Sequence, residues 1–320
     1  MTVRDDRWPR RHADAAWLRA ALPDGDAAAL VPIGRGVDSL AFRCGASVVR
    51  VARSAQAADG LQREACTLAR IADHLPVAVP RPTFARPAAC RAFSVHAALE
   101  GVALTGARWR RLRAPARERA AADLAGFLAS LHELPVADVR PCALPVLGCA
   151  AHARRLRADA ERLHDLLAPA VRERLDATLG AWAQGADVPP VVLHRDLSPD
   201  HVLHDPASGR ITGILDFGDL AIGDPARDFI FLREDVGEAL LAAVLRRYPH
   251  ARAATLAPRV RQWGLLEAVE WTLGRHAARR AGERRAGERR ADELREGLAA
   301  VAQALDDALD PALAPAAGGA

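Results

Sequence analysis

The chain has 320 residues, 44 of them basic and 40 acidic, for a formal net charge of +4, and half of its residues are apolar. This length and composition suit one large domain or two modest ones with a buried core, and they exclude a disordered or disulfide-dependent scaffold. All 44 basic residues are arginine. The absence of lysine excludes Schiff-base chemistry and the lysine that commonly binds phosphate, so arginine, backbone amides or a metal must contact any phosphate.

The positive charge is concentrated near the C-terminus. Residues 275–290 hold seven arginines against two glutamates, a local charge of +5 that leaves the rest of the chain at −1. Aromatic residues make up only 4% of the chain, so few rings are available to stack on bases. We therefore expect no nucleic-acid partner and interpret the arginine-rich segment as a solvated helix face.

Cysteine usage and the N-terminal segment indicate the compartment. The five cysteines are odd in number and show no CxxC or Cys/His metal spacing, which indicates a reduced, intracellular chain. No run approaches the roughly 20 apolar residues of a membrane span, and MTVRDDRWPRRHADAAW has no apolar stretch typical of a signal peptide. We expect a cytoplasmic monomer that does not contact membranes.

The first third of the chain changes from helical to extended patterning. Residues 10–22 predict a helix that ends near Pro23. Residues 30–53, LVPIGRG, DSLAFRCG and SVVRVAR, then predict an antiparallel meander of three strands joined by turns. Apolar residues at helical spacing predict an amphipathic helix over residues 61–75, and a further strand is expected over residues 91–97.

The remainder is mostly helical. Helical periodicity covers residues 117–132, 150–167, 172–182, 236–247 and 258–278. We therefore predict an α+β fold with a β-rich small lobe and a helical large lobe. The expected divisions are an N-terminal helix (1–24), a small lobe with a hinge (25–98), a helical lobe (99–310) and a tail (311–320).

One stretch in the helical lobe breaks this pattern. Residues 191–228, VVLHRDLSPDHVLHDPASGRITGILDFGDLAIGDPARD, contain two short β runs and concentrate His, Asp and Gly. If these two runs pair as a hairpin, Asp216 and His201 come together as a mixed oxygen and nitrogen metal site, and Asp196 stays available to accept a proton. A magnesium-bound nucleotide also needs a cation and a covering loop, which Arg50 and the Gly34-Arg35-Gly36 turn supply.

HRDLSPDH, ILDFGD and GDPARD resemble the motifs of the aminoglycoside phosphotransferase family, small-molecule kinases with the protein-kinase-like fold. The resemblance covers nearly the whole chain and implies ATP or GTP as the phosphate donor, with Mg²⁺. Most family members carry Asn where His201 stands. Histidine at this position is similar to the 2″-aminoglycoside phosphotransferases and to the macrolide phosphotransferases, and RDFIFLRED with WGLLEAVEWTLG resembles the former more.

The resemblance implies roles for individual residues. Asp196 matches the catalytic aspartate that orients the substrate hydroxyl, and His201 and Asp216 match the magnesium ligands. Arg50 stands at the position of the phosphate-binding lysine, and Glu64 matches its ion-pair partner. Further matches are the glycine turn over the phosphates (Gly34 and Gly36), the adenine-binding hinge (His96 to Ala98) and a carboxylate that braces the catalytic loop (Asp228).

A cationic acceptor requires carboxylates. Residues 214–238 hold seven acidic residues against two arginines, a local charge of −5 beside the candidate catalytic residue. Glu267 and Trp271 share one helix face at i and i+4, where charge and ring together suit an amino sugar. The candidate substrate residues are Asp219, Glu234, Asp235, Glu267, Glu270 and Trp271.

Other interpretations remain open at this point. His201 also fits a plain hydrogen-bonding histidine because imidazole is an unusual magnesium ligand. Arg50 and Glu64 also fit an ordinary ion pair, and Glu267 with Trp271 also fits a solvated glutamate and a core tryptophan. Alternative functions are a macrolide, sugar or amino-alcohol kinase and a nucleotide-binding pseudokinase without turnover.

Overall fold

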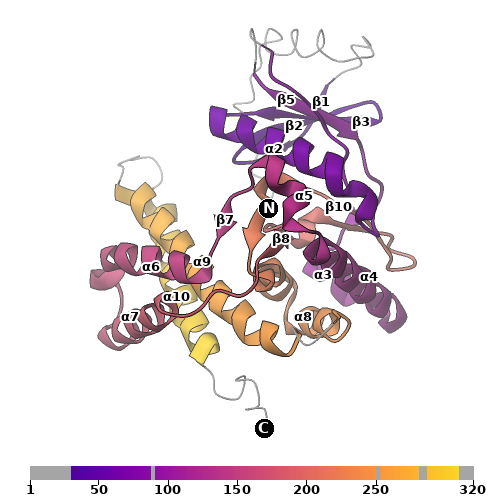
Figure 1. Ribbon diagram of the computed structural model, residues 1–320. Helices are drawn as coiled ribbons and strands as arrows, with labels where there is room; N and C mark the ends of the chain where they lie inside the picture. Colours follow the sequence, from indigo (N-terminus) through magenta and orange to yellow (C-terminus); the bar gives the residue numbers. More distant parts are fainter. Residues whose placement is uncertain (1–29, 88–90, 250–252, 281–286, 310–320) are drawn as a thin grey trace. The chain divides into compact units, whose positions relative to one another are not determined.

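The computed structural model describes residues 30–87, 91–249, 253–280 and 287–309 (Figure 1). The chain divides into two compact units. Unit 1 consists of Met1–Ala72 and Val79–Leu99, and unit 2 of Asp73–Ala78 and Glu100–Ala320. The helix predicted over residues 10–22 and the tail predicted from residue 311 lie outside the described residues.

Unit 1 is built on one antiparallel sheet. Its order is β1-β2-β3-β5-β4, so the first three strands form a meander and β5 pairs beside β3. This confirms the meander and the strand predicted over residues 91–97. The short strand β4 was not predicted, because three residues carry too little periodicity. The strands are β1 Val31–Arg35, β2 Ser39–Cys44, β3 Ser47–Ala52, β4 Thr83–Ala85 and β5 Phe93–Ala97.

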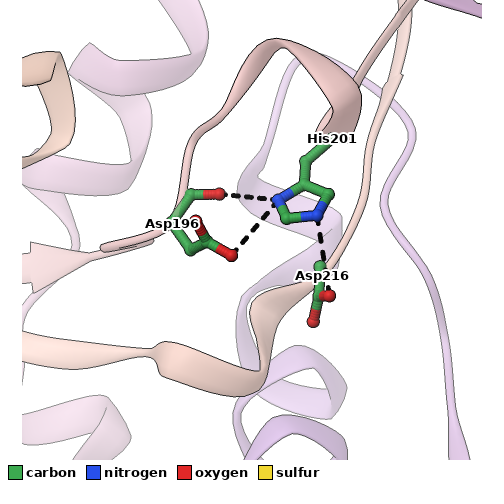
Figure 2. Close-up of side chains that lie close together, drawn as sticks. All are labelled: Asp196, His201 and Asp216. Atoms are coloured by element: carbon green, nitrogen blue, oxygen red, sulfur yellow. Dashed lines mark hydrogen bonds and ion pairs between the residues drawn. The ribbon is translucent and has the colours of Figure 1, made fainter. Parts of the chain in front are cut away.

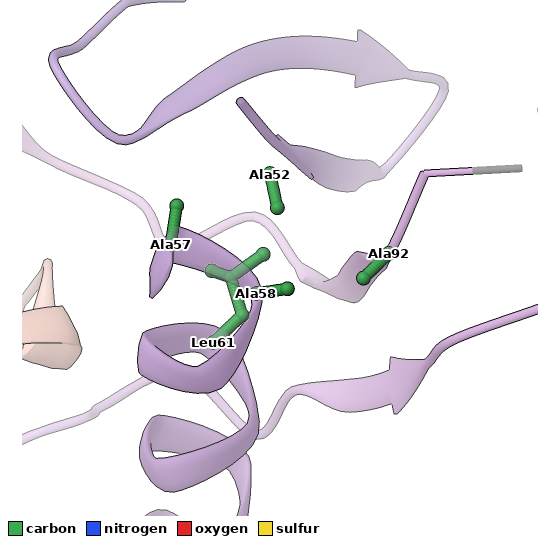
Figure 3. Packing of buried hydrophobic residues seen from close by; sticks show 5 residues of the cluster. All are labelled: Ala52, Ala57, Ala58, Leu61 and Ala92. Carbon is green, nitrogen blue, oxygen red and sulfur yellow. The ribbon is translucent and has the colours of Figure 1, made fainter. Parts of the chain in front are cut away.

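Helix α2 (Ala55–Ile71) packs against this sheet. Ser54 caps its first turn by accepting the amide of Ala57 at 3.1 Å. Figure 3 shows the start of the helix facing the sheet, where small alanine side chains and Leu61 form a buried cluster. The predicted amphipathic helix is confirmed, with its last turn continued as the 3₁₀ turn Ala72–His74.

Unit 2 is mostly helical, and together the two units confirm the predicted α+β class. Four of the expected helices match with small shifts of their ends, but the one expected over residues 150–167 ends at Ala160 and continues as a 3₁₀ segment, Glu161–Leu166. The helices are α3 Gly106–Arg111, α4 Ala114–Glu133, α5 Val136–Val139, α6 Cys149–Ala160, α7 Pro169–Ala183, α8 Glu238–Leu245, α9 Ala253–Arg280 and α10 Gly287–Leu309.

Helix α10 was missed by the sequence analysis. It buries Leu294, Val301 and Leu305, which lie on one face at helical spacing, and it packs against α9. The arginine-rich repeats, residues 281–290, overlap the start of this helix at Gly287.

Two small sheets carry the stretch 191–228. One has the order β10-β9-β6 and the other β7-β11-β8. The predicted hairpin between the two β runs is therefore wrong, since β8 pairs with β11 and β10 pairs with β9. The strands are β6 Val102–Ala103, β7 Val146–Leu147, β8 Val191–Leu193, β9 Val202–His204, β10 Ile211–Ile214 and β11 Ala221–Gly223.

The thiols differ in state. Cys44 and Cys149 are free, whereas Cys66 and Cys142 are disulfide-bonded, so the expectation of a fully reduced chain is wrong for the latter two. Within the described residues, no helix combines the length and the apolar character that crossing a bilayer requires.

Candidate active site

The loop that follows β8 begins with the buried His194. Its Nε2 lies 3.0 Å from the carbonyl oxygen of Leu215, and its ring packs edge-on against Phe217 with centroids 4.5 Å apart. Burial is the main cause that lowers the pKa of His194. A neutral imidazole thus connects this loop to the segment that leads into Asp216.

Asp228 holds the backbone of the same loop. Its Oδ2 accepts the amide of His194 at 2.9 Å and its Oδ1 accepts that of Arg195 at 2.6 Å. A third donor, His132 Nε2, lies 3.1 Å from Oδ2. Burial is the largest single influence and by itself would raise the pKa of Asp228, but the interactions with His132 and His194, the hydrogen bond of His132 first among them, together outweigh it, and the pKa is lowered. These contacts are those of a buried, ionised, bracing carboxylate.

Two residues of the site have left-handed backbone. Arg195 has φ 72° and Asp216 has φ 61°, although neither is glycine. Such conformations persist only where surrounding contacts hold them, and they cluster at functional sites. The Asp228 hydrogen bond to the Arg195 amide provides one such restraint, and it fixes the direction in which the chain enters Asp196.

Asp196, His201 and Asp216 converge in unit 2. Each offers a ligand atom, and these atoms all lie within 4.8 Å of one another. Figure 2 shows the imidazole of His201 between the two carboxylates: its Nδ1 is 3.4 Å from Asp196 Oδ2 and its Nε2 is 3.7 Å from Asp216 Oδ2. The residues singled out in HRDLSPDH and ILDFGD are therefore neighbours, although the strand pairing that joins them differs from the one expected.

The contacts of His201 define which nitrogen is available to a ligand. Nδ1 lies 2.8 Å from the backbone carbonyl oxygen of Asp196 and 3.3 Å from Ser198 Oγ. A carbonyl oxygen only accepts, so Nδ1 carries the proton and the lone pair of a neutral ring is on Nε2, toward Asp216. Histidine metal ligands typically donate their second ring N–H in this way.

Asp196 has an unusual titration. Burial is the main cause that raises its pKa from 3.8 to about 6, with the charges of Asp216 and Asp219 adding to the effect and that of His201 opposing it. A carboxyl with a pKa close to neutrality is well matched to accepting a proton.

In unit 1, Arg50 and Glu64 form a buried ion pair. Arg50 Nη1 lies 3.0 and 2.9 Å from the two carboxylate oxygens of Glu64. The side chains are 14% and 2% exposed, so α2 holds its carboxylate inside the unit and turns the guanidinium of β3 toward it. The predicted pair is present, and its role in phosphate binding stays a prediction.

The glycine turn is held by an arginine that sequence analysis did not single out. Arg53 Nη1 donates to the carbonyls of Gly36 and Val37 at 2.7 and 2.9 Å. Among the described residues of unit 1, a Cβ added at Gly34 or Gly36 would meet nothing closer than 3.8 and 3.5 Å. Packing against these described residues does not explain the two glycines, which is compatible with close approach of a ligand to the backbone.

The predicted hinge is the end of β5. His96 is buried, and its Nδ1 lies 2.9 Å from the carbonyl oxygen of Ala97. The amide of Ala98 donates to Ala46 at 2.8 Å. The Ala98 N–H is thus already used within unit 1, and the role of this segment in binding adenine stays a prediction.

The candidate substrate carboxylates fall into two groups. Asp219 lies 3.4 Å from Arg195 Nη1 and is 53% exposed. Burial is the main cause that raises the pKa of Glu234, to about 7, and Glu267 and Asp235 add to it. Burial also raises the pKa of Asp235. These groups lie after Asp216 and on the π-helical turn Leu232–Val236.

The other candidates lie on α9 and contact the protein itself. Glu267 pairs with the buried Arg227. Glu270 accepts Arg155 Nη2 at 2.8 Å, and the hydrogen bond of His152 is the main cause that lowers the pKa of Glu270 to about 2. The guanidinium of Arg275 lies over the ring of Trp271, 4.6 Å from its centroid, although Trp271 stays 41% exposed. Compensated charges and a ring that already contacts a cation make these residues weaker candidates for binding a cation than the sequence suggested.

His132 and Tyr248 were also missed. His132 lies at the end of α4 beside buried leucines, and its Nδ1 is 2.8 Å from the hydroxyl of Tyr248. A polar residue on an otherwise apolar helix face was the available signal for His132, and Tyr248 is the chain's only tyrosine.

Comparison with known proteins defines the class. The fold matches the GDP complex of wild-type aminoglycoside 2′-phosphotransferase-IIIa, with 25% identity, TM-score 0.79 and coverage of 91% of this chain and 96% of that one. The GDP and kanamycin complex of APH(2″)-IIIa gives 26% identity, TM-score 0.79 and coverage of 90% and 96%. The macrolide 2′-phosphotransferase of Brachybacterium faecium, with 24% identity, TM-score 0.61 and coverage of 85% and 91%, shares the fold. These likenesses confirm the protein-kinase-like fold.

The sequence itself assigns the family. Residues 29–263 match the model of the phosphotransferase enzyme family, so the chain belongs to this family, as its motifs suggested. The viomycin phosphotransferase of Streptomyces vinaceus is 34% identical over 85 residues, 26% of this chain and 30% of that protein. The uncharacterized protein YcbJ of Bacillus subtilis (strain 168) is 40% identical over 60 residues, 19% of each chain. The chain thus matches less than a third of the length of these two relatives.

Proposed function

We propose that this protein transfers the γ-phosphate of ATP or GTP to a hydroxyl of a cationic, aminoglycoside-like antibiotic. The observation that carries the proposal is the convergence of Asp196, His201 and Asp216 within 4.8 Å, together with the hold of Asp228 on the backbone that leads into Asp196. Membership of the phosphotransferase enzyme family supports the reaction type.

In this proposal Asp196 accepts the proton of the acceptor hydroxyl and orients its oxygen toward the phosphorus. Its pKa of about 6 leaves most molecules ionised at neutral pH while keeping the carboxylate basic enough to receive a proton. Catalysis consists mainly of positioning and of charge neutralisation, as is general for phosphoryl transfer.

Asp216 and His201 are proposed to hold Mg²⁺. The donor set fits, because carboxylate oxygens are the ligands that this ion prefers and the Nε2 lone pair of His201 is directed toward Asp216. When bound, the ion would supply positive charge to the phosphate oxygens. Imidazole is less suited to Mg²⁺ than an amide oxygen, so we expect an ion that binds less tightly than at a site with Asn.

The nucleotide is proposed to bind through unit 1. Arg50, oriented by Glu64, takes the part of the missing lysine, and an always-charged guanidinium can contact two phosphate oxygens at once. The backbone around Gly34 and Gly36 covers the phosphates, and the segment from His96 to Ala98 contacts the base.

The acceptor is proposed to be recognised chiefly by Asp219, Glu234 and Asp235. A bound ammonium group stabilises the ionised form of Glu234, so this residue should gain charge when a cation binds. Because Glu267 and Glu270 already have arginine partners, we assign them a smaller part, and Trp271 likewise.

The test is a phosphotransfer screen with both nucleotides and Mg²⁺ against gentamicin, kanamycin, viomycin, erythromycin and small amino alcohols. The product is detected by mass as the acceptor plus one phosphate, and an Asp196→Asn preparation serves as the inactive control. We expect transfer to at least one aminoglycoside. Transfer to erythromycin but not to gentamicin or kanamycin would overturn the acceptor assignment, and nucleotide binding without any turnover would indicate a pseudokinase.

A further inference from the structure

A chain of buried polar groups extends from the catalytic loop to the end of α8. Asp228, with no side-chain exposure, accepts the amides of His194 and Arg195 on one side and His132 on the other. His132 is itself only 1% exposed, so water does not complete its hydrogen bonding. The state of its second ring nitrogen therefore matters to the whole arrangement.

That second nitrogen is paired with Tyr248. A carboxylate only accepts, so Nε2 of His132 carries a proton, and in a neutral ring Nδ1 is left as an acceptor. The hydroxyl of Tyr248 lies 2.8 Å from Nδ1 and is the one partner that the described residues give this nitrogen; it donates when the ring is neutral and accepts when the ring is charged. In either state the hydroxyl holds the ring in the orientation in which Nε2 donates to Asp228. Without it, the buried nitrogen would lack a partner, which favours rotation or loss of the imidazole from this position.

The aromatic ring of Tyr248 is held separately from its hydroxyl. It packs edge-on against Phe229, with centroids 5.3 Å apart, and against His132 at 5.7 Å. Its backbone amide also continues the hydrogen bonding of α8 through Val244 at 2.8 Å. A phenylalanine at this position would keep these ring contacts and remove the hydroxyl that meets His132.

We propose that Tyr248 is a positioning residue of this phosphotransferase, acting through His132 and Asp228 on the backbone that carries Asp196. Arg195 has φ 72° immediately before Asp196, a conformation that the Asp228 hydrogen bond restrains. Loss of the Tyr248 hydroxyl loosens His132, weakens the hold of Asp228 on the amides of His194 and Arg195, and lets the Asp196 carboxylate leave its productive direction. The inference about Asp196 rests on the proposed function.

The experiment compares Tyr248→Phe with the wild-type chain by backbone amide hydrogen exchange under native conditions. We expect the amides of His194 and Arg195 to exchange about fivefold faster in the variant, because a net hydrogen bond is worth roughly 1 kcal/mol. A purely local role for Tyr248 would accelerate exchange in α8 and leave these two amides unchanged, and that result would overturn the proposal.

A matched control removes a comparably buried hydroxyl elsewhere in unit 2. Thr178 Oγ1 donates to the carbonyl of Arg174 at 2.7 Å on α7, and Thr178 is 7% exposed. Thr178→Val should lower thermal stability while leaving the exchange of the His194 and Arg195 amides at the wild-type rate. Equal acceleration in both variants would show general loosening instead of a specific connection.

Two further readouts separate this inference from the proposed function. With an acceptor from the screen, Tyr248→Phe should lower kcat by roughly fivefold and leave the nucleotide KM within about twofold, as expected for lost positioning. In a His132→Gln background, the Tyr248→Phe change should have no further effect on the two amides. Since exchange needs no turnover, it tests the connection even if no acceptor is found. If the wild-type chain transfers phosphate but Tyr248→Phe leaves the exchange of the two amides unchanged, only the role of Tyr248 is contradicted.

Discussion

Two carboxylates at the catalytic loop have opposite environments. Asp228 is buried, receives three N–H donors and has a lowered pKa, whereas Asp196 is 32% exposed and has a pKa raised to about 6. Ionised Asp228 therefore stabilises the folded chain, and ionised Asp196 costs stability. A carboxylate that braces a loop is satisfied by the protein itself, while one that reacts is left partly unsatisfied for its substrate.

Asp228 and Asp196 also differ in how their contributions to folding stability depend on pH. The stability from Asp228 is present above the unfolded pKa of about 3.8 and is lost as the pH falls below it, because its folded pKa is lowered. The stability associated with protonated Asp196 is present below about 3.8 and is lost as the pH rises through about 6, because its folded pKa is raised. The two residues thus contribute with opposite signs at neutral pH.

The largest expected effect is on stability at Asp228. Asp228→Asn leaves at least one of three converging N–H donors unsatisfied in the core and should lower the free energy of unfolding by about 3 kcal/mol or more. Urea unfolding monitored by circular dichroism measures this. Asp138→Asn, at an exposed position on α5, should change the free energy by less than about 0.5 kcal/mol. Comparable losses of unfolding free energy in the two variants would contradict the special role of Asp228 in holding the loop.

Arg50 provides the next test, on the nucleotide side. Arg50→Ala should raise the nucleotide KM or lower kcat at least tenfold, about 1.4 kcal/mol, because a phosphate contact is lost. Arg50→Lys keeps a charge for the buried Glu64 and should recover part of the activity. Arg43→Ala, on β2 of the same sheet, should match the wild type in steady-state kinetics. If Arg50→Ala also matched the wild type in steady-state kinetics, phosphate would have to be bound elsewhere.

His201 tests the metal assignment. His201→Leu should raise the Mg²⁺ concentration needed for half-maximal activity by several-fold to about tenfold, since one ligand is removed. His201→Asn supplies an oxygen and should need no more Mg²⁺ than the wild type. A magnesium titration of activity separates the variants. Identical titrations for all three proteins would mean that His201 serves only as a hydrogen-bonding residue.

The smallest effect concerns the stability cost of Asp196. Above pH 6, Asp196→Asn should raise the free energy of unfolding by an amount on the order of 1 kcal/mol after solvent screening, and the melting temperature with it; near pH 4 both should be unchanged. Thermal unfolding in the absence of nucleotide and Mg²⁺ measures this directly. A melting temperature that falls above pH 6 would show that ionised Asp196 is a stabilising group like Asp228.

Local sequence patterns predicted much of the fold. Alternation and turn glycines identified the meander of residues 30–53, and helical spacing identified α2 and α4. Motif spacing identified Asp196, His201 and Asp216. Pairing between three-residue strands was not predictable, and β8 joined β11 instead of the expected partner, because so short a run contains no pairing information.

The parts of the site that the sequence did not predict depend on contacts between residues far apart in the chain. His132 contacts Asp228, 96 positions later, and Tyr248, 116 positions later, and no local pattern connects them. Likewise, the carboxylate count in residues 214–238 indicated an acidic surface, but only the fold reveals that Arg227 neutralises Glu267. Charges can be counted from a sequence, whereas their compensation depends on tertiary packing.

The most direct test of the proposed chemistry is the rate of γ-phosphate transfer to an acceptor hydroxyl by Asp196→Asn at saturating nucleotide, measured beside the nucleotide dissociation constant of the same preparation. If Asp196 is the group that accepts the hydroxyl proton, transfer should fall by about 1,000-fold or more while nucleotide affinity stays within about threefold of the wild type. Transfer within tenfold of the wild-type rate would contradict the assignment of Asp196 as the reacting carboxylate.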